Sequence, residues 1–325
     1  SDLWQNDTPT LRIPYYRSLE PLQPGFLPGR AEQHLAGQVF SGLTRFNGNS
    51  SEPTGDLAHH WEVSADGLRW HFYIRSTLHW HNGDKIETAQ LQRSLTALLT
   101  LPALRTLFRS VLRIETTHPQ CLTFVLHQPD YWLAHRLATY CSRLAHPDHP
   151  AVGCGPFRLA AFEPDLVRLE SHEQYHLSHP LLKAIEYWIT PQLFDYRLGT
   201  SCRHPVQIAI GEADELETLR LVSSSTSLGF CYLTLKQSAR LSELQAKRLI
   251  NIIHLSRLLH TLPLNEGLIT PTQELLPGWT IPEWPDLTDV ALPESLTLVY
   301  HLPVELHTMA SQLKTYLARQ GCELT

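Results

Sequence analysis

The sequence predicts an α/β fold, because segments with the two-residue period of a strand and segments with the period of a helix follow one another. Apolar and polar residues alternate over residues 69–74, as in a half-buried strand. Over residues 87–99 the leucines instead fall on one face of a helix. Near the C-terminus, a strand at 296–302 and a helix at 305–321 predict the opening of a βαβ unit.

The remaining elements can be taken in chain order. A first strand at 11–16 leads through a proline-rich loop to a short helix at 31–43, in which Leu35, Val39 and Leu43 are spaced four apart. A proline-rich passage at 271–293 has the composition of a linker between units. The other expected elements are strands at 121–127, 157–162, 166–171, 184–190 and 206–211, and a long helix at 241–263 that ends at Pro263.

Composition excludes some classes of protein. The 325 residues are 42% hydrophobic, and no apolar run approaches the roughly 18 residues that would span a membrane. The net charge of −6 is unlike that of domains that grip a nucleic-acid backbone, which are usually basic. The chain starts without an initiator methionine or an apolar signal-peptide core, and it stops just after an expected helix. We therefore expect a piece of a longer protein.

The six cysteines favour a reducing compartment. They stand at positions 121, 141, 154, 202, 231 and 322, without a C-x-x-C pair. In an exported protein they could still form three disulfide bridges. Two of them lie in the apolar or glycine-rich runs GFCYL and GCGPF, where small buried thiols are ordinary. The interpretation we adopt is reduced cysteines in the cytoplasm.

Histidines are abundant and raise the question of a metal centre. His79 and His81 are two residues apart, so on a strand both side chains point the same way. A catalytic zinc site needs three protein ligands, and any of the 19 histidines can be nominated as the third. The pair Asn82-Gly83 that follows is typical of a tight turn. We expect a strand entering a turn here, with no metal site and no cofactor.

Other catalytic patterns have simpler interpretations. The segment GCGPF at 153–157 has the glycines of a phosphate loop, but Pro156 stops the helix that such a loop needs. A glycine turn before a strand fits better. Cys154 is expected to be a structural thiol rather than a nucleophile, and the acidic cluster at 211–217 a solvated helix start. The chain is therefore not expected to be an enzyme.

A family resemblance rests on a run of motifs in residues 43–95. This run resembles the extracellular solute-binding proteins of family 5, the peptide, nickel and opine binders of ABC transporters. The segment 153–157 and the helix that contains AKRLINIIHLSRLL are similar to later family motifs. The matching motifs are Leu57-Ala58-His59-His60-Trp61, Asp66-Gly67-Leu68-Arg69-Trp70, Arg75 and Trp80-His81-Asn82-Gly83.

Within that family, residues 11–47 with LAHHW after them look most like the effector part of SgrR-type transcriptional regulators, which respond to sugar-phosphate stress. In those proteins a winged-helix DNA-binding domain precedes a cytoplasmic solute-binding module. Three departures loosen any inference about ligand: Cys154 replaces a threonine, Gln90 stands where aspartate is frequent, and Leu255-Ser256 replaces aspartate-arginine.

The resemblance implies an α/β, periplasmic-binding-protein-like fold of type II, family 5. This fold is bilobal, and the chain is expected to hold most of the first lobe and the start of the second. Ligands of such proteins lie between lobes that close by a hinge. The implied segments are 1–45 and 151–270 in the first lobe, 46–150 as its inserted subdomain, 271–293 as linker and 294–325 as the truncated second lobe.

The implied function is effector sensing: a small metabolite, such as a sugar phosphate, would control DNA binding by a winged-helix domain outside this chain, without a membrane partner. The candidate ligand contacts are Tyr15, Tyr16, Arg17 and, more weakly, Arg45. The alternative is that the tyrosines pack in the core and Arg17 is merely solvated. Two rival functions stay open, namely a periplasmic binding protein of an ABC transporter for peptide or nickel, and a metal-dependent hydrolase built on the histidines.

Overall fold

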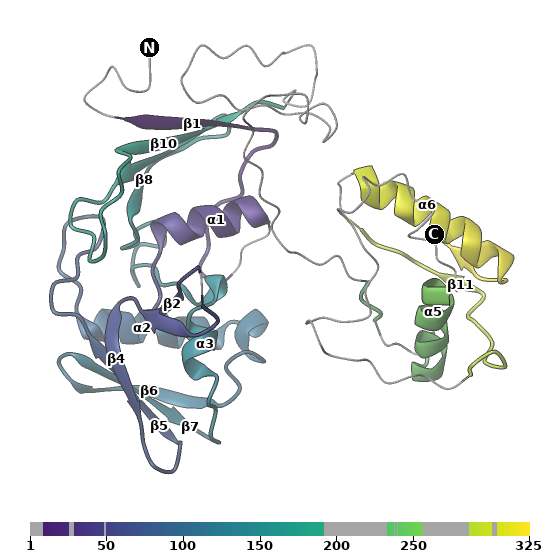
Figure 1. Cartoon of the computed structure of the whole chain (residues 1–325), viewed down its shortest axis with the longest axis horizontal. Coiled ribbons are helices and arrows are strands. Elements are labelled where there is room, and N and C mark those ends of the chain that lie inside the picture. The colour runs from purple at the N-terminus through teal and green to yellow at the C-terminus, as the bar shows by residue number, and fades with distance from the viewer. Residues whose placement is uncertain are drawn as a thin grey trace. The chain divides into compact units, whose positions relative to one another are not determined.

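The computed structural model describes residues 9–25, 29–48, 50–191, 233–236, 238, 240–255, 286–300 and 304–325. The chain divides into two compact units, Ser1–Gly211 and Glu212–Thr325. Figure 1 shows the elements of each unit. The second unit begins earlier than the second lobe expected at 294. The expected assignment of segments to lobes remains a prediction.

Two four-stranded sheets contain most of the strands described in the first unit, and the first of these sheets is mixed. It consists of β1 (Thr10–Tyr15), β10 (Ala184–Ile189), β9 (Leu166–Ser171) and β8 (Phe157–Phe162), in that order. β1 is parallel to β10, and the other pairs are antiparallel. Helix α1 (Arg30–Val39) lies along one face (Figure 1). The core between them is formed by Leu35, Ala36, Val39, Phe157, Val167, Leu169, Ile185 and Tyr187.

The opposite face of this sheet carries charges of alternating sign. Glu186, at the centre, contacts Arg12 at 3.2 Å and Arg168 at 3.5 Å. Arg168 also lies 3.3 Å from Glu170, which pairs in turn with Arg158 on β8. Opposite charges on facing strands stabilise a sheet and favour one register. The alternation therefore fixes how all four strands align.

The second sheet is antiparallel, in the order β4 (Ala58–Val63), β5 (Arg69–Ile74), β7 (Cys121–Leu126) and β6 (Val111–His118). Helix α2 (Thr88–Thr100) packs on one face. The alternation predicted for 69–74 is confirmed, because Trp70, Phe72 and Ile74 are buried against Phe124 and the leucines of α2. The smaller elements are β2 (Thr44–Phe46), β3 (Pro53–Gly55), α3 (Leu133–Leu137) and two short 3₁₀ helices, η1 (Pro102–Leu104) and η2 (Tyr140–Ser142).

Gln90 sets the start of α2. Its amide oxygen accepts a hydrogen bond from the backbone N–H of Glu87 at 2.9 Å, and the Glu87 side chain caps the helix in return. This reciprocal pair satisfies two backbone donors that the first helical turn leaves open. The same oxygen accepts the indole N–H of the buried Trp80 at 3.0 Å. The residue that departs from the family pattern therefore has a structural role here.

The second unit contains the predicted βαβ opening. It comprises α5 (Glu243–Leu255), β11 (Ser295–Leu296), α6 (Val304–Arg319) and β12 (Glu323–Leu324), and β11 and β12 are parallel. The prediction of a strand followed by a helix is confirmed, although the strand is shorter than expected. Its core is formed by Leu249, Leu313, Leu317, Cys322 and Leu324.

One prediction differs from the structure, and others lie outside the described residues. Helix α1 ends at Val39 and not at residue 43, because Phe40 is already extended and Ser41 forms a β-bridge with Leu144. The strand expected at 206–211, the end of the helix expected at 241–263 and most of the linker at 271–293 lie outside the described residues.

Candidate functional site

The end of β1 brings three of the four predicted ligand residues together. The rings of Tyr15 and Tyr16 lie 4.8 Å apart between centroids, and the Arg17 guanidinium lies 5.6 Å from the Tyr15 ring centroid. Tyr15 packs on the core under the sheet, whereas Tyr16 is 42% exposed. The result is a surface with two aromatic rings, two hydroxyls and one guanidinium.

Glu32, which the sequence analysis does not single out, holds Arg17 in place. The Nη1 and Nη2 atoms of Arg17 donate to the two carboxylate oxygens of Glu32 at 2.6 and 2.9 Å. The Glu32 carboxylate is fully buried, and it also accepts the backbone N–H of Glu20 at 3.1 Å. A further hydrogen bond runs from Nη1 to the carbonyl of Ser18. Two arms of the guanidinium are therefore committed within the protein.

This pairing shifts the pKa of several groups. Burial disfavours the charged form of Glu32, but the hydrogen bonds from Arg17 and from the amide of Glu20 outweigh it, and they lower the pKa of the Glu32 carboxyl. Hydrogen bonding to Glu32 raises the pKa of Arg17. Burial and the neighbouring Tyr16 raise the pKa of Tyr15. Glu32 is thus ionised and Arg17 protonated at neutral pH.

The local sequence explains why Arg17 can reach Glu32. Gly29 is the residue before α1, and a Cβ atom there would lie 2.7 Å from both Arg17 Nη2 and Glu32 Oε2. The absence of a side chain leaves room for the ion pair. The sequence shows that Glu32 lies in the first turn of the helix after Gly29, where an acidic residue is favourable. It does not show that Glu32 is buried or that Arg17 is its partner.

Arg45 belongs to a different place in the structure. It lies on β2, which pairs with β3 and not with β1. Its charge acts on Tyr175, whose pKa is raised to about 12 because burial and the negative charge of Asp56 outweigh Arg45. Asp56 in turn lies 2.7 Å from Nε2 of His176, and both side chains are almost fully buried. If Arg45 contacts a ligand, it does so at a location separate from Tyr15, Tyr16 and Arg17.

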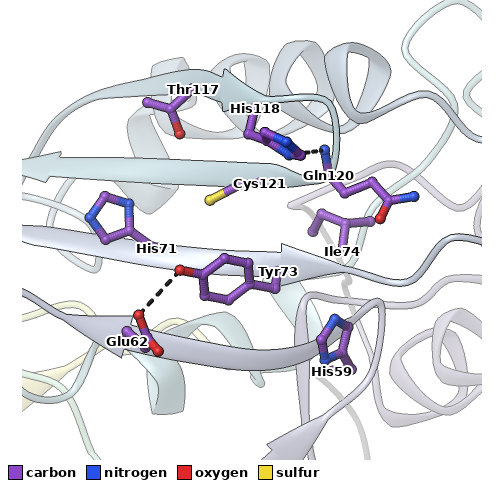
Figure 2. Close-up of a pocket in the computed structure, with 9 residues that line it drawn as sticks. All are labelled: His59, Glu62, His71, Tyr73, Ile74, Thr117, His118, Gln120 and Cys121. Carbon is purple, nitrogen blue, oxygen red and sulfur yellow. Dashed lines mark hydrogen bonds between the residues drawn. The ribbon is translucent and has the colours of Figure 1, made fainter.

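A groove on the outer face of the β4–β5–β7–β6 sheet is a second candidate site (Figure 2). Tyr73 donates a hydrogen bond to Glu62 at 3.1 Å, and this raises the pKa of Tyr73. His71 Nδ1 lies 2.8 Å from the hydroxyl of Thr123 on the neighbouring strand. The residues that line the groove are His59, Glu62, His71, Tyr73, Ile74, Thr117, His118, Gln120 and Cys121. The alternation in 69–74 implied this polar face, but the facing strands could not be identified from the sequence.

The segment 153–157 forms a tight turn that packs against α1. The Gly155 amide donates to the carbonyl of Val39 at 2.9 Å, and a Cβ atom on either Gly153 or Gly155 would collide with the last carbonyls of the helix. Cys154 is 1% exposed, and burial raises the pKa of its thiol. A buried, protonated thiol is a poor nucleophile. The prediction that Cys154 is structural fits this geometry.

The predicted turn after His81 is confirmed. The Gly83 amide donates to the carbonyl of Trp80 at 2.9 Å, and Gly83 has a φ of 91°. Both ring nitrogens of His81 contact backbone groups of the turn at 153–155. Within the described ranges, no three His, Cys, Asp or Glu side chains are arranged to hold a metal ion. In the same part of the chain, no helix has the length and apolar character that crossing a membrane requires.

Part of the chain is similar to a known family model, and most of it is similar to two curated proteins. Residues 52–193 match the model of bacterial extracellular solute-binding proteins, family 5 Middle. The chain is 69% identical over 322 residues to the uncharacterized protein YbaE of Escherichia coli K12. It is 28% identical over 330 residues to the HTH-type transcriptional regulator SgrR of Yersinia pestis Pestoides F. These alignments cover 99% and 97% of this chain but 57% of each relative.

Solved structures support the same fold. NikA from Brucella suis, crystallised with Fe(III)-EDTA, superposes with a TM-score of 0.68 at 18% identity, over 98% of this chain and 74% of that chain. DppA from Helicobacter pylori, in complex with the peptide STSA, gives a TM-score of 0.67 at 15% identity, over 97% and 73%. The predicted periplasmic-binding-protein-like α/β fold is confirmed.

Proposed function

We propose that this chain, which contains a domain of solute-binding protein family 5, senses a small metabolite through the surface at the end of β1 and passes the signal to a DNA-binding domain elsewhere in the protein. The regulatory part rests on the similarity to SgrR, which is named as an HTH-type transcriptional regulator. The proposed regulatory role implies a cytoplasmic location. The chain acts by binding and not by catalysis.

The observation that carries the proposal is the surface of Tyr15, Tyr16 and Arg17. Tyr16 leaves a large aromatic ring 42% exposed beside a guanidinium whose side chain is 34% exposed. An exposed tyrosine offers a flat apolar face and a hydroxyl, which together suit a small polar molecule. Arg45 is a separate and weaker candidate contact. A phosphorylated sugar is one candidate effector. Whether Arg17 can bind its phosphate depends on the pairing of Arg17 with Glu32.

The test uses the full-length protein and a panel of phosphorylated and unphosphorylated sugars. A metabolite that raises the melting temperature is then titrated by calorimetry against wild type, Tyr16→Ala and Arg17→Lys. A lost contact of this kind typically costs ~1.5–3 kcal/mol, or roughly ten- to a hundredfold in affinity. We expect Tyr16→Ala to weaken the binding of any effector. For a phosphorylated effector, Arg17→Lys should retain part of the binding and Arg17→Met should abolish it. Unchanged affinity in Tyr16→Ala would remove this surface from the site.

Arg17→Ala needs its own control, because it leaves the buried Glu32 carboxylate without a partner. Circular dichroism and the melting temperature must therefore show that this variant folds. Arg17→Ala in an otherwise folded protein should reduce the response of the attached DNA-binding domain to the effector.

A second function has support from the solved structures. DppA, which has a similar fold, is described as an ABC transporter-associated periplasmic binding protein. Transport binding is therefore the alternative. Fractionation of cells that express the full-length protein distinguishes the two: recovery from the periplasm favours transport, and recovery with the nucleoid or cytoplasm favours regulation.

A further inference from the structure

We infer that Glu32 makes the surface at the end of β1 electrically neutral, so that it selects an uncharged polar ligand and rejects a phosphorylated one. This inference rests on the proposed function, because it names the ligand class of that same surface. Glu32 would be a specificity-determining residue that acts through Arg17.

The first support is the number of donors that Arg17 has already used. A guanidinium has five N–H donors. Nη1 serves Glu32 and the carbonyl of Ser18, and Nη2 serves the second oxygen of Glu32. Tyr16 is a further hydrogen-bonding neighbour of the same group. The Nη1/Nη2 fork, one of the two with which a guanidinium can clasp a phosphate in a bidentate manner, is already occupied by a carboxylate.

The second support is charge. Phosphate binding by arginine depends on a net positive charge at the contact. The Glu32 carboxylate is fully buried and lies 2.6 Å from Nη1, so it neutralises Arg17 from within the protein. Tyr15 adds no charge at neutral pH, since burial raises the pKa of its hydroxyl. A phosphate dianion would therefore meet a surface without net positive charge.

The third support is that the pair is held rigidly. The backbone amide of Glu20 fixes the carboxylate from one side, and Gly29 leaves a space that a Cβ atom could not share with Arg17 and Glu32. Reorienting Arg17 towards a ligand would strand a buried carboxylate, which is strongly unfavourable. What remains exposed to a ligand is the face of Tyr16, which suits an unphosphorylated sugar or another neutral polar molecule.

The experiment titrates inorganic phosphate into the wild-type chain, Glu32→Gln and the double variant Arg17→Ala/Glu32→Gln by calorimetry. We expect no saturable binding to wild type. Glu32→Gln keeps the shape but frees the charge of Arg17, so it should bind phosphate saturably, at least about tenfold more tightly than the detection limit that wild type fails to reach. The double variant should lose that gain. The matched control is Asp148→Asn, which frees Arg93 from an exposed pair and should gain nothing.

Two outcomes overturn the inference. One is saturable phosphate binding to wild type that Arg17→Ala abolishes. The other is a folded Glu32→Gln protein that binds phosphate no better than wild type. If Glu32→Gln does not fold, the side-chain N–H resonance of Arg17 in the wild-type protein decides: a shift on adding phosphate contradicts the inference, and an unchanged resonance supports it.

These results are separable from the proposed function. The phosphate titrations need no knowledge of the effector and no DNA-binding domain. If no metabolite alters the full-length protein while Glu32→Gln still gains phosphate binding, the sensing role fails and the neutral-surface inference stands. If a sugar phosphate binds through Arg17 in wild type, the sensing role stands and the inference fails.

Discussion

The Nε2 atom of His81 lies 3.0 Å from the carbonyl oxygen of Gly155, across the junction between the two sheets of the first unit. Nδ1 of the same ring accepts the backbone N–H of Gly153 at 3.3 Å. An imidazole fulfils both roles only when it is neutral and carries its proton on Nε2. The ring therefore joins the turn at 80–83 to the turn at 153–155, and its protonation would break one of the two contacts.

Stability should consequently fall as the pH is lowered. Burial lowers the pKa of His81 to about 4, whereas an unfolded histidine titrates near ~6.5. As the pH falls, the unfolded chain binds this proton before the folded chain does. The contribution of His81 to the free energy of unfolding is therefore complete above pH ~6.5, and it declines by up to about 3 kcal/mol as the pH falls to about 4. Urea unfolding of wild type and His81→Gln across this range checks it.

The control for that series is His118→Gln, since His118 is exposed. It should keep the wild-type slope, whereas His81→Gln should flatten it. His172, whose pKa burial also lowers, leaves a residual slope in both. Equal slopes in wild type and His81→Gln would contradict the role assigned to this ring.

Gly153→Ala should destabilise the first unit strongly. The new Cβ would collide with the carbonyl of Val39 and press on the ring of Phe40, so the turn and α1 would have to separate. Overpacking of this kind costs about 3 kcal/mol or more when backbone atoms are involved. Gly48→Ala, where the added Cβ meets nothing within 4 Å, is the matched control. Chemical denaturation of both variants measures the difference, and similar midpoints would disprove the packing argument.

The sequence predicted the strands that their own apolar residues reveal. Strands β8 and β9 fall at the predicted residues. In β9 the buried Val167 and Leu169 alternate with less buried neighbours, whereas in β8 only Phe157 is buried. Strands β4 and β6 were missed, because they carry many polar side chains such as His60 and Glu115, and each has a break in register that interrupts the two-residue period. Each pairs with the strand next to it in sequence, β4 with β5 and β6 with β7, so no distant partner is needed to explain the miss.

The candidate site shows the same division. The adjacent residues Tyr15, Tyr16 and Arg17 could be predicted as one group because they are consecutive at the end of a strand. Their partner Glu32 could not, because only folding of α1 onto the sheet brings its carboxylate to Arg17. The sequence analysis left open whether the tyrosines pack in the core. The structure answers differently for each, since Tyr15 packs on the core and Tyr16 is exposed.

All six cysteines should titrate as free thiols in denaturant without reductant, as expected for a protein of a reducing compartment. In the described part of the chain Cys121, Cys141, Cys154 and Cys322 are free. Under native conditions Cys154 should react at least about a hundredfold more slowly than a model thiol, because it is buried and protonated. Mass spectrometry after timed alkylation identifies each position. Two or fewer free thiols in denaturant would favour an exported protein.

The purified protein should hold no stoichiometric zinc. His81 uses both ring nitrogens for backbone contacts, so it has no lone pair to offer while the turn is intact. Elemental analysis after chelator treatment measures the metal content. A retained equivalent of zinc that His79→Ala removes would revive the hydrolase alternative.

The parallel pairing of β1 with β10 constrains the order in which the chain can acquire structure during synthesis. Ile13 faces Tyr187, so the first strand to leave the ribosome waits for one of the last strands of its unit. The β4–β5–β7–β6 sheet and α2 draw their core from residues in between, so they can become compact earlier. Throughout that interval β1 presents an unpaired edge with the apolar side chains of Leu11 and Ile13, a surface that a ribosome-associated chaperone would shield.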